Sequence, residues 1–529
     1  MSFSYSLRLF FLSENGTIVL SKLVDLGQPK VGEYRVNTTK RYDVLIVGAG
    51  VVGCAIAREL SRYSLSVGVV EKEKDVSFGT SSRNSGVVHA GFNYAPGSLR
   101  AKLDVEGNRL MEPLCRKLKV KMSRIGKLTV ALHSQEMPGL EALKEQGEAN
   151  GVPGLEILDS FAMQKIQPGV EGVGALWSPS SGIVCPYGLT IALARSARQN
   201  GVDFYLSWEV AHIFREESGF ILENSLGEEL KASVVINAAG LFADRMARMV
   251  GIDDYTLYPC RGEYYVLDKR LEGTLKTLLY PAPRKNDPGL GIHLTPTVDG
   301  NILIGPSAEY TELPEDWACS ASVMENLRKK GKELFPDLSA SDFIRNFAGL
   351  RPKLSPPEEG GNRDFVVEDR QDVPGFINLM GVESPGLTSA PALALMVRDM
   401  VGNHLELQEK ANFLEELPGR EKSFAESSPE ERAALVAEDP NYGEMVCRCE
   451  QVTKREILDA LSDPLGARTL MSIKYRTRAT MGRCQGGFCF PKIVNIMTRE
   501  LGYDPEEISL RDEKSFFFPG RVRKEEVAL

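Results

Sequence analysis

Short apolar runs alternate with amphipathic segments along most of the chain. Residues 42–47 and 66–70 are apolar and rich in β-branched side chains, which predicts two buried strands, and residues 54–60 between them have the spacing of a helix. A further apolar run at 232–237 predicts another strand. Strands that alternate with helices favour an α/β fold with a largely parallel sheet. We therefore predict one large α/β unit over residues 41–417, with an inserted mixed sheet.

Forty residues precede this unit. Ser2 to Leu9 alternate polar with apolar side chains, and Asn15-Gly16 is a favoured pair for a type I′ turn. Residues 1–40 therefore predict a β-hairpin, with a disordered extension as the alternative.

The chain after the large unit divides into three parts. Residues 418–441 are charged and contain proline, as a linker does, and Ser428 is placed to begin a short helix there. Residues 442–505 contain four clustered cysteines and helical stretches, one of them near 454–461, which predicts a small second domain. Residues 506–529 form a tail.

Charge and composition narrow the classes of function. The 529 residues include 63 Lys and Arg against 72 Asp and Glu, a formal net charge of −9, which argues against a surface that wraps nucleic acid. The sequence has no run of 18 or more consecutive apolar residues, so it predicts no transmembrane helix. The start of the chain lacks the features of a secretory signal. The sequence thus predicts a cytoplasmic protein that reaches the inner face of the cell membrane only peripherally, through a partner.

The first strand runs directly into a GxGxxG pattern and a helix. This pattern suits a dinucleotide, because Gly48 allows a tight turn, Gly50 lets the backbone approach the pyrophosphate and Gly53 allows close helix packing. The helix N-terminus offers unpaired N–H groups to the anion. Glu71 ends the second strand, where an acid accepts hydrogen bonds from an adenosine ribose. The hydroxyl-rich run at 80–85 favours FAD over NAD.

Four further runs carry a family resemblance: residues 84–91 (NSGVVHAG), 96–103 (PGSLRAKL), 261–265 (RGEYY) and 348–352 (AGLRP). With the glycine turn, they resemble the D-amino-acid-oxidase-like (DAO) superfamily, and within it the FAD-dependent glycerol-3-phosphate dehydrogenases and L-2-hydroxyglutarate dehydrogenases. The resemblance implies a Rossmann-type FAD-binding domain with an inserted mixed-sheet substrate domain. The FAD contacts expected on the motifs and the resemblance are Gly48, Gly50, Gly53, Glu71, Thr80, Ser81, Ser82, Asn84, Ser85, Val210, Ala239, Gly240, Gly349, Gly381, Ser384, Pro385, Gly386, Leu387 and Thr388.

His89 is the candidate base. In both resembled families the histidine of this run lies beside the flavin ring and takes the proton of the substrate hydroxyl. Such a base needs a pKa near the working pH and must lie within hydrogen-bonding reach of the hydroxyl. A buried core histidine is the alternative, because Val87, Val88 and Ala90 flank it.

Arg351 is the candidate anion clamp, because a planar guanidinium can hold phosphate or carboxylate through two hydrogen bonds. Lys353 adds charge in the same run. A surface ion pair is the alternative for Arg351. Weaker candidates for the roof of the substrate pocket are Arg261, Tyr264, Tyr265 and His293.

Two substrates remain open on these motifs. The runs at 182–187, 350–353 and 381–388 resemble the large subunits of anaerobic glycerol-3-phosphate dehydrogenases. The run at 291–296, which contains His293, is instead similar to L-2-hydroxyglutarate dehydrogenases. The first expectation is oxidation of sn-glycerol 3-phosphate to dihydroxyacetone phosphate, and the alternative is oxidation of L-2-hydroxyglutarate or of another 2-hydroxy or 2-amino acid.

The clustered cysteines follow a C-x-C and C-x4-C pattern formed by Cys447, Cys449, Cys484 and Cys489. Zinc ribbons more often use C-x2-C pairs, so structural zinc is the alternative here. The pattern resembles the bacterioferritin-associated-ferredoxin-like (BFD-like) [2Fe–2S] domain, and four thiolates suit such a cluster. The basic residues expected to offset its negative charge are Lys474, Arg476, Arg478 and Arg483.

Two redox centres in one chain predict a path for electrons. A flavin takes two electrons as hydride and releases them singly, and an iron–sulfur cluster carries one electron at a time. The expected partners are a small anionic hydroxy substrate and an electron-accepting protein subunit or quinone. A non-catalytic flavin and iron–sulfur relay is the alternative of a different class.

Overall fold

The computed structural model describes residues 9–11, 18–20, 40–283, 291–360, 363–419 and 422–520. Near the start of the chain, β1 (Leu9–Phe11) pairs antiparallel with β2 (Ile18–Leu20). The predicted Asn15-Gly16 turn and most of the remaining N-terminal segment lie outside the described residues.

The first half of the large α/β unit is built on an eight-stranded sheet, called sheet A here. Strands β11, β4, β3, β14 and β22 pair with one another in parallel. β13 and β12 extend the sheet from β14 as an antiparallel meander, and β21 pairs antiparallel with β22. Sheet A comprises β11 (Asp203–Leu206), β4 (Val67–Glu71), β3 (Lys40–Val47), β14 (Glu229–Asn237), β13 (Gly219–Asn224), β12 (Val210–Glu216), β22 (Phe376–Met380) and β21 (Val366–Asp369).

Helices pack against both faces of sheet A, and the alternating side chains of each strand point to opposite faces. Val44 and Ile46 of β3 pack in one buried cluster with helices α1 (Val51–Leu60), α5 (Pro186–Gln199) and α8 (Gly386–Val401). Leu45 and Val47 pack on the other face with α6 (Ala243–Met249) and the meander. The strand and helix predicted around the glycine turn are thus confirmed.

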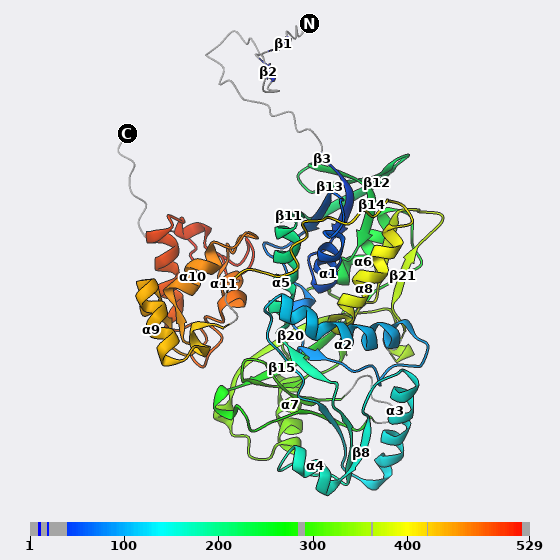
Figure 1. Cartoon of the computed structure of the whole chain (residues 1–529), viewed down its shortest axis with the longest axis vertical. Coiled ribbons are helices and arrows are strands. Elements are labelled where there is room, and N and C mark those ends of the chain that lie inside the picture. The colour runs from blue at the N-terminus through cyan, green and yellow to red at the C-terminus, as the bar shows by residue number, and fades with distance from the viewer. Residues whose placement is uncertain are drawn as a thin grey trace.

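The second half is built on a nine-stranded mixed sheet, sheet B, which lies below sheet A in Figure 1. Its strands are β19 (Glu309–Tyr310), β15 (Tyr258–Leu267), β18 (Ile302–Gly305), β17 (His293–Pro296), β16 (Leu278–Pro281), β7 (Lys127–Ala131), β9 (Gly174–Ser178), β8 (Glu156–Asp159) and β20 (Phe343–Lys353). The helices of this half are α3 (Met137–Ala149), α4 (Ser160–Ile166) and α7 (Ala321–Leu334). The predicted α/β fold with a mixed second sheet is confirmed.

Between the two sheets lie α2 (Leu99–Lys117) and a small sheet of β5 (Val87–Val88), β10 (Gly182–Val184) and β6 (Met122–Ser123). The antiparallel pairing of β15 with β20 runs from Tyr258 opposite Lys353 to Leu267 opposite Phe343. This long ladder carries the ends of both strands toward sheet A, so residues of sheet B face the glycine turn.

Residues 422–520 form a separate bundle, called the cysteine unit here and coloured orange to red in Figure 1. Its elements are α9 (Pro429–Glu438), β23 (Met445–Cys447), β24 (Val452–Thr453), α10 (Lys454–Leu461), α11 (Leu470–Thr477) and α12 (Cys489–Asn495), the last continued by a π-helical turn (Ile496–Glu500). Ser428 caps α9, because its Oγ accepts a hydrogen bond from the Glu431 N–H at 3.2 Å. The predicted helices beginning at Ser428 and covering 454–461 are confirmed.

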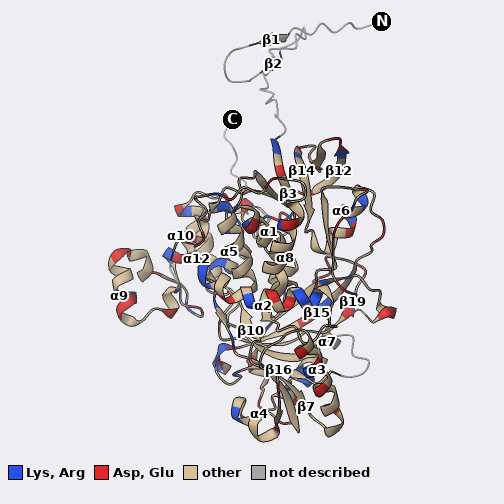
Figure 2. Ribbon diagram, turned by 45° about the vertical axis from the view of Figure 1, so that its right-hand side comes forward, with Lys and Arg blue, Asp and Glu red and all other residues tan. Residues whose placement is uncertain are grey.

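The cysteine unit docks on both halves of the large unit through charged groups. Basic and acidic residues are interspersed along the ribbon, so such pairs form readily between elements (Figure 2). The pairs with the first half are Arg476–Asp75, Arg195–Asp463 and Arg511–Glu73, and those with the second half are Arg478–Asp299, Lys269–Glu450 and Arg483–Asp268. None of the helices in the described ranges combines the length and apolar character needed to cross a membrane.

Candidate functional site

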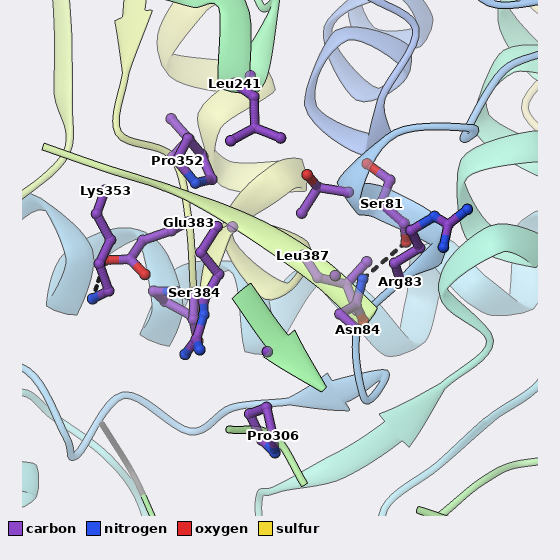
Figure 3. A pocket seen from close by; sticks show the side chains of 18 of the residues that line it. Ser81, Arg83, Asn84, Leu241, Pro306, Pro352, Lys353, Glu383, Ser384 and Leu387 are labelled. Carbon is purple, nitrogen blue, oxygen red and sulfur yellow. Dashed lines mark hydrogen bonds and ion pairs between the residues drawn. The ribbon is translucent and has the colours of Figure 1, made fainter. Parts of the chain in front are cut away.

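One cavity of about 1200 Å³ lies between the two halves. Its walls come from the loops that follow the parallel strands of sheet A, which is where α/β sheets bind ligands, and from strands of sheet B. The predicted residues that line it are Gly48, Gly50, Glu71, Thr80, Ser81, Asn84, Ser85, His89, Val210, Ala239, Gly240, Tyr264, His293, Gly349, Arg351, Lys353, Ser384, Pro385, Gly386 and Leu387. Figure 3 shows Ser81 and Asn84 at one end of this cavity and Lys353 with Glu383 at the other.

The glycine turn forms the first end of the cavity. Gly48 has φ +106°, and a Cβ there would lie 2.5 Å from the Ala238 carbonyl oxygen, so only glycine fits. Gly50 precedes α1, and no side chain caps the N-terminus of this helix. The N–H groups of the first turn are thus available to an anion in the cavity, except for that of Val51, which donates to the Ser81 Oγ at 2.9 Å.

Glu71 lies beside the same turn at the end of β4. Its Oε2 accepts a hydrogen bond from the Ala49 N–H at 2.7 Å, and its Oε1 accepts one from the Glu73 N–H at 3.0 Å. Burial raises the pKa of this carboxyl group, although the two N–H donors oppose the shift. Each carboxylate oxygen has a second lone pair, so Glu71 can also accept a ligand hydroxyl.

The loop at residues 80–86 contacts strand β20 of sheet B. The Thr80 Oγ1 donates to the Leu350 carbonyl at 2.7 Å. Gly349 allows this contact, because a Cβ there would lie 1.9 Å from the Arg83 carbonyl oxygen. The side chain of Asn84 closes the loop, donating to the Ser81 carbonyl and accepting from the Gly86 N–H, both at 2.8 Å.

Some predicted cofactor contacts do not line the cavity, namely Gly53, Ser82, Gly381 and Thr388. A Cβ on Gly53 would lie 2.0 Å from the Gly48 carbonyl oxygen, so this glycine packs beneath the turn. Thr388 is fully buried, and its Oγ1 accepts a hydrogen bond from the His89 N–H at 3.0 Å. Gly53 and Thr388 thus lie behind the lining of the cavity.

Two histidines lie at the second end of the cavity. The His89 Nδ1 is buried and has no hydrogen-bond partner among the described residues. His293 stacks on Tyr280 with ring centroids 3.8 Å apart, and its Nδ1 lies 2.9 Å from the Gly291 carbonyl oxygen. Because a carbonyl only accepts, neutral His293 carries its proton on Nδ1 and presents the Nε2 lone pair, which has no partner in the described structure.

Burial decides the charge of both histidines. It lowers the pKa of His89 well below the usual value, and the buried Lys127 and nearby His293 act in the same direction. Burial likewise lowers the pKa of His293 to about 3. Both imidazoles are therefore neutral at neutral pH and able to accept a proton or a hydrogen bond.

Arg351 and Lys353 lie on the same strand near the histidines, and each donates a hydrogen bond to another residue of the cavity wall. The sequence predicted these two basic residues but not their partners. Arg351 lines the cavity, and its Nη2 donates to the Ser307 carbonyl at 2.7 Å. The Lys353 Nζ donates to Glu383 Oε1 at 3.2 Å, and Arg100 Nη2 donates to the same oxygen at 2.8 Å. Arg100 and Glu383 both line the cavity and were missed as site residues, although both lie in the runs that carried the family resemblance.

Arg261 and Tyr265 do not line the cavity. The guanidinium of Arg261 pairs with Asp316 at 2.5 Å, Glu263 at 3.2 Å and Glu309 at 3.6 Å. These carboxylates hold it in the wall of sheet B, which corrects its assignment to the roof of the pocket.

The four clustered cysteines come together in the cysteine unit. All nine cysteines of the chain are free thiols. Cys447 and Cys489 perturb each other's pKa, as do Cys449 and Cys484, and Cys447 also acts on the pKa of Cys449. The hydrogen bond from Cys489 lowers the pKa of Cys447 to about 6, burial opposes this, and backbone N–H groups support it.

Two pairs of thiols form a donor set that suits the two irons of a [2Fe–2S] cluster. Burial acts to raise the pKa of Cys484, but the backbone N–H groups of Phe488 and Gly486 outweigh it and lower this pKa, which favours a thiolate. Within the described ranges, no group of three or more His, Cys, Asp or Glu side chains is arranged to hold a single metal ion.

Three of the four basic residues near these cysteines pair with carboxylates of the large unit. Arg476, Arg478 and Arg483 form the ion pairs that dock the cysteine unit on the large unit. Lys474 is buried, and desolvation together with the neighbouring Arg345 and Arg83 lowers its pKa to about 7. The three arginines are paired with carboxylates, and their expected role in offsetting the charge of a cluster stays a prediction.

The two parts of the chain match different family models. Residues 43–400 match the FAD dependent oxidoreductase (DAO) family, and residues 445–499 match the BFD-like [2Fe-2S] binding domain. A glycerol 3-phosphate dehydrogenase of Caloramator mitchellensis is 40% identical over 493 residues, covering 92% of this chain and 99% of that protein. The mitochondrial L-2-hydroxyglutarate dehydrogenase of Homo sapiens is 31% identical and covers 72% of this chain and 93% of its own length.

Among solved structures, the dithionite-reduced L-alpha-glycerophosphate oxidase from Mycoplasma pneumoniae with FAD bound superimposes with a TM-score of 0.67 at 31% identity. The match covers 72% of this chain and all of that one. The chain described here therefore belongs to the FAD-dependent oxidoreductases of the DAO family, and a BFD-like [2Fe–2S] binding domain follows its oxidoreductase unit.

Proposed function

We propose that this enzyme oxidises sn-glycerol 3-phosphate to dihydroxyacetone phosphate. The observation that carries the proposal is a single cavity with a nucleotide-type glycine turn at one end and two neutral histidines beside Arg351 and Lys353 at the other. The relative from Caloramator mitchellensis, which is named glycerol 3-phosphate dehydrogenase and matches over nearly the full length, supports the same substrate.

The residues at the first end fit FAD. Gly48, the uncapped start of α1 and the carboxylate of Glu71 offer a close backbone approach, N–H donors and a hydroxyl acceptor. When bound, FAD supplies the acceptor for the hydride that leaves the substrate carbon. Gly349 and Thr80 hold β20 against this end of the cavity. Arg351 and Lys353 on β20 therefore keep a fixed place relative to the loop at residues 80–86.

The chain's own residues handle the anion and the proton. Arg351, fixed by the Ser307 carbonyl, binds the phosphate of the substrate. The substrate hydroxyl gives its proton to the unpartnered Nδ1 of His89. Burial keeps this imidazole neutral, and its lowered pKa makes it a weaker base than a histidine in water. His293 offers its Nε2 lone pair as an acceptor for the other hydroxyl of the substrate, the one at C1.

The cysteine unit extends this function. We propose that Cys447, Cys449, Cys484 and Cys489 hold a [2Fe–2S] cluster, which when bound is a one-electron carrier. Cys449 is exposed, so a cluster held by these cysteines would be open to approach by an electron-accepting protein subunit or quinone.

An anaerobic titration tests the substrate. Purified enzyme is titrated with sn-glycerol 3-phosphate and, separately, with L-2-hydroxyglutarate. The flavin absorbance at about 450 nm and the broader absorbance of the cluster are recorded during each titration. Bleaching by sn-glycerol 3-phosphate is the expected result. If neither compound reduces a flavin that dithionite does reduce, the proposed substrate class is wrong.

L-2-hydroxyglutarate is the second candidate, because His293 lies in the cavity and its run is similar to that of hydroxyglutarate enzymes. The human L-2-hydroxyglutarate dehydrogenase matches over most of its length, although at lower identity. Bleaching by the hydroxy acid alone would select this candidate.

A further inference from the structure

Arg100 is a buried arginine on the wall of the cavity. Its side chain is 9% exposed, and it is the second residue of α2. Arginine is rarely buried to this degree without a paired anion, because removing the charge from water is costly. Its Nη2 donates to Glu383, but its Nε is buried without a hydrogen-bond partner among the described residues. Arg100 thus lines the cavity with one guanidinium N–H, that of Nε, unused within the described structure.

Glu383 holds this arginine and Lys353 in one network. Its Oε1 accepts from Arg100 at 2.8 Å and from Lys353 at 3.2 Å, so one carboxylate oxygen serves two cations that come from α2 and β20. Glu383 itself belongs to the loop before α8, which also supplies Ser384 and Pro385 to the cavity. Figure 3 shows Lys353, Glu383 and Ser384 together at this end.

Two further contacts fix the guanidinium in place. The ring of Phe365 lies under Arg100, with the guanidinium carbon 4.9 Å from the ring centroid. Asp364 accepts the N–H groups of Leu99 and Arg100 at 2.6 and 2.9 Å, which anchors the turn that carries the arginine. The side chain is thus preorganised, and binding an anion costs little additional ordering.

Arg351 lies on the same side of the cavity as this network. It stands two residues before Lys353 on β20, and side chains at i and i+2 of a strand point to the same face. Arginines from two different elements therefore meet the cavity near the loop that carries Glu383. This arrangement suits an anionic group with several acceptor oxygens, such as a phosphate.

We propose that Arg100 is a specificity-determining residue that binds the anionic group of the substrate together with Arg351, and that Glu383 is the positioning residue that sets its geometry. The proposal rests on the proposed function and adds a substrate contact from α2. A phosphate ester makes fuller use of the two guanidinium groups than an uncharged alcohol does.

The test is steady-state kinetics of the holoenzyme with an artificial electron acceptor, comparing wild type with Arg100→Met and Arg100→Lys. We expect Arg100→Met to raise KM for sn-glycerol 3-phosphate about 10- to 100-fold, the range for loss of a charge-assisted hydrogen bond, with kcat changed less than about threefold. The Ki of inorganic phosphate as a competitive inhibitor rises in parallel. Arg100→Lys gives values between the two, because lysine keeps the charge but not the planar donors.

The matched control is Arg109→Met on the exposed face of the same helix, where the arginine pairs with Glu106. It leaves KM and the phosphate Ki unchanged. If Arg100→Met leaves KM and Ki as in wild type, or lowers kcat alone, the proposal is overturned. If Arg100→Met does not retain FAD, Arg100→Lys decides, and an unchanged KM and Ki in that variant overturn the proposal.

The proposed function fails separately, in the wild type. Wild-type enzyme that does not oxidise sn-glycerol 3-phosphate refutes the substrate. In that case the phosphate Ki is measured against the substrate that does reduce the flavin, and a Ki unchanged by Arg100→Met refutes the role of Arg100.

Discussion

The ion pair between Arg476 and Asp75 allows a quantitative test of how the cysteine unit is held. Arg476 donates through Nη1 and Nη2 to both oxygens of Asp75, at 2.5 and 3.0 Å, and through Nε to Asp463 at 2.9 Å. The side chains are 2% exposed for the arginine and fully buried for both aspartates. The perturbation is Arg476→Met, which keeps the apolar stem and removes the charge.

The expected magnitude follows from what the substitution leaves behind. Asp75 loses its cation and keeps one hydrogen bond, from the Val76 N–H, while Asp463 still has Arg195. Removing one partner of a buried pair costs about 3–5 kcal/mol, because the other charge remains in low dielectric. The cysteine unit of the variant is therefore expected to detach from the large unit at least about 100 times as often as in wild type.

Hydrogen exchange of the holoenzyme at pH 7, read by mass spectrometry, measures this opening. Peptides covering α11 and residues 72–78 exchange through opening of the interface, so their rates report its free energy. The control is Arg455→Met, which breaks an exposed pair with Asp459 on α10, worth about 0.3–0.5 kcal/mol. The control is expected to change these rates less than about threefold.

The double variant Arg476→Met with Asp75→Leu completes the test. Replacing both partners of a buried pair by apolar groups is often neutral, so the double variant should recover most of the loss. A change of less than about fivefold in the Arg476→Met exchange rates, corresponding to about 1 kcal/mol, would refute the reasoning. So would a double variant that opens more often than the single one.

Three further results are expected. Gly53→Ala places a methyl group against the Gly48 carbonyl and should release FAD, which is measured as loss of flavin absorbance after gel filtration. The control, Gly139→Ala on α3, has open space around the new methyl group and should retain FAD fully. Because burial lowers the pKa of His89 and a base acts unprotonated, kcat should stay level as the pH falls through 6.5, and an acid limb centred at or above 6.5 would contradict this assignment. Cys484→Ser should remove the broad cluster absorbance measured after reconstitution and leave the flavin band, and an unchanged spectrum would exclude Cys484 as a ligand.

The parts of the fold set by local sequence could be predicted. The strand before Gly48 and the helix after it follow from apolar spacing and a glycine pattern that only one turn geometry satisfies. The helix at 454–461 likewise has a local cause, the capping box formed by Thr453 and Glu456. Packing beyond these segments decides the rest.

The site could be predicted only where a residue's role depends on its own motif. Arg261 looked available for a substrate, but Asp316 and Glu309, some fifty residues later, pair with it in the folded chain. Arg100 was overlooked because its partner Glu383 lies 283 residues away in sequence. Long-range partners of this kind leave no signal in a single sequence, since the ion pair depends on how the sheets pack.

The docking of the cysteine unit also affects how the enzyme can move. Arg476 binds Asp75 beside sheet A, and Arg478 binds Asp299 in the turn between β17 and β18 of sheet B. The unit therefore braces the two halves against each other, and a hinge motion that widened the cavity would have to break buried charge pairs. Removing the cysteine unit would then both interrupt the proposed electron path and free this hinge, so a truncated enzyme would differ from the full chain in rigidity as well as in redox chemistry.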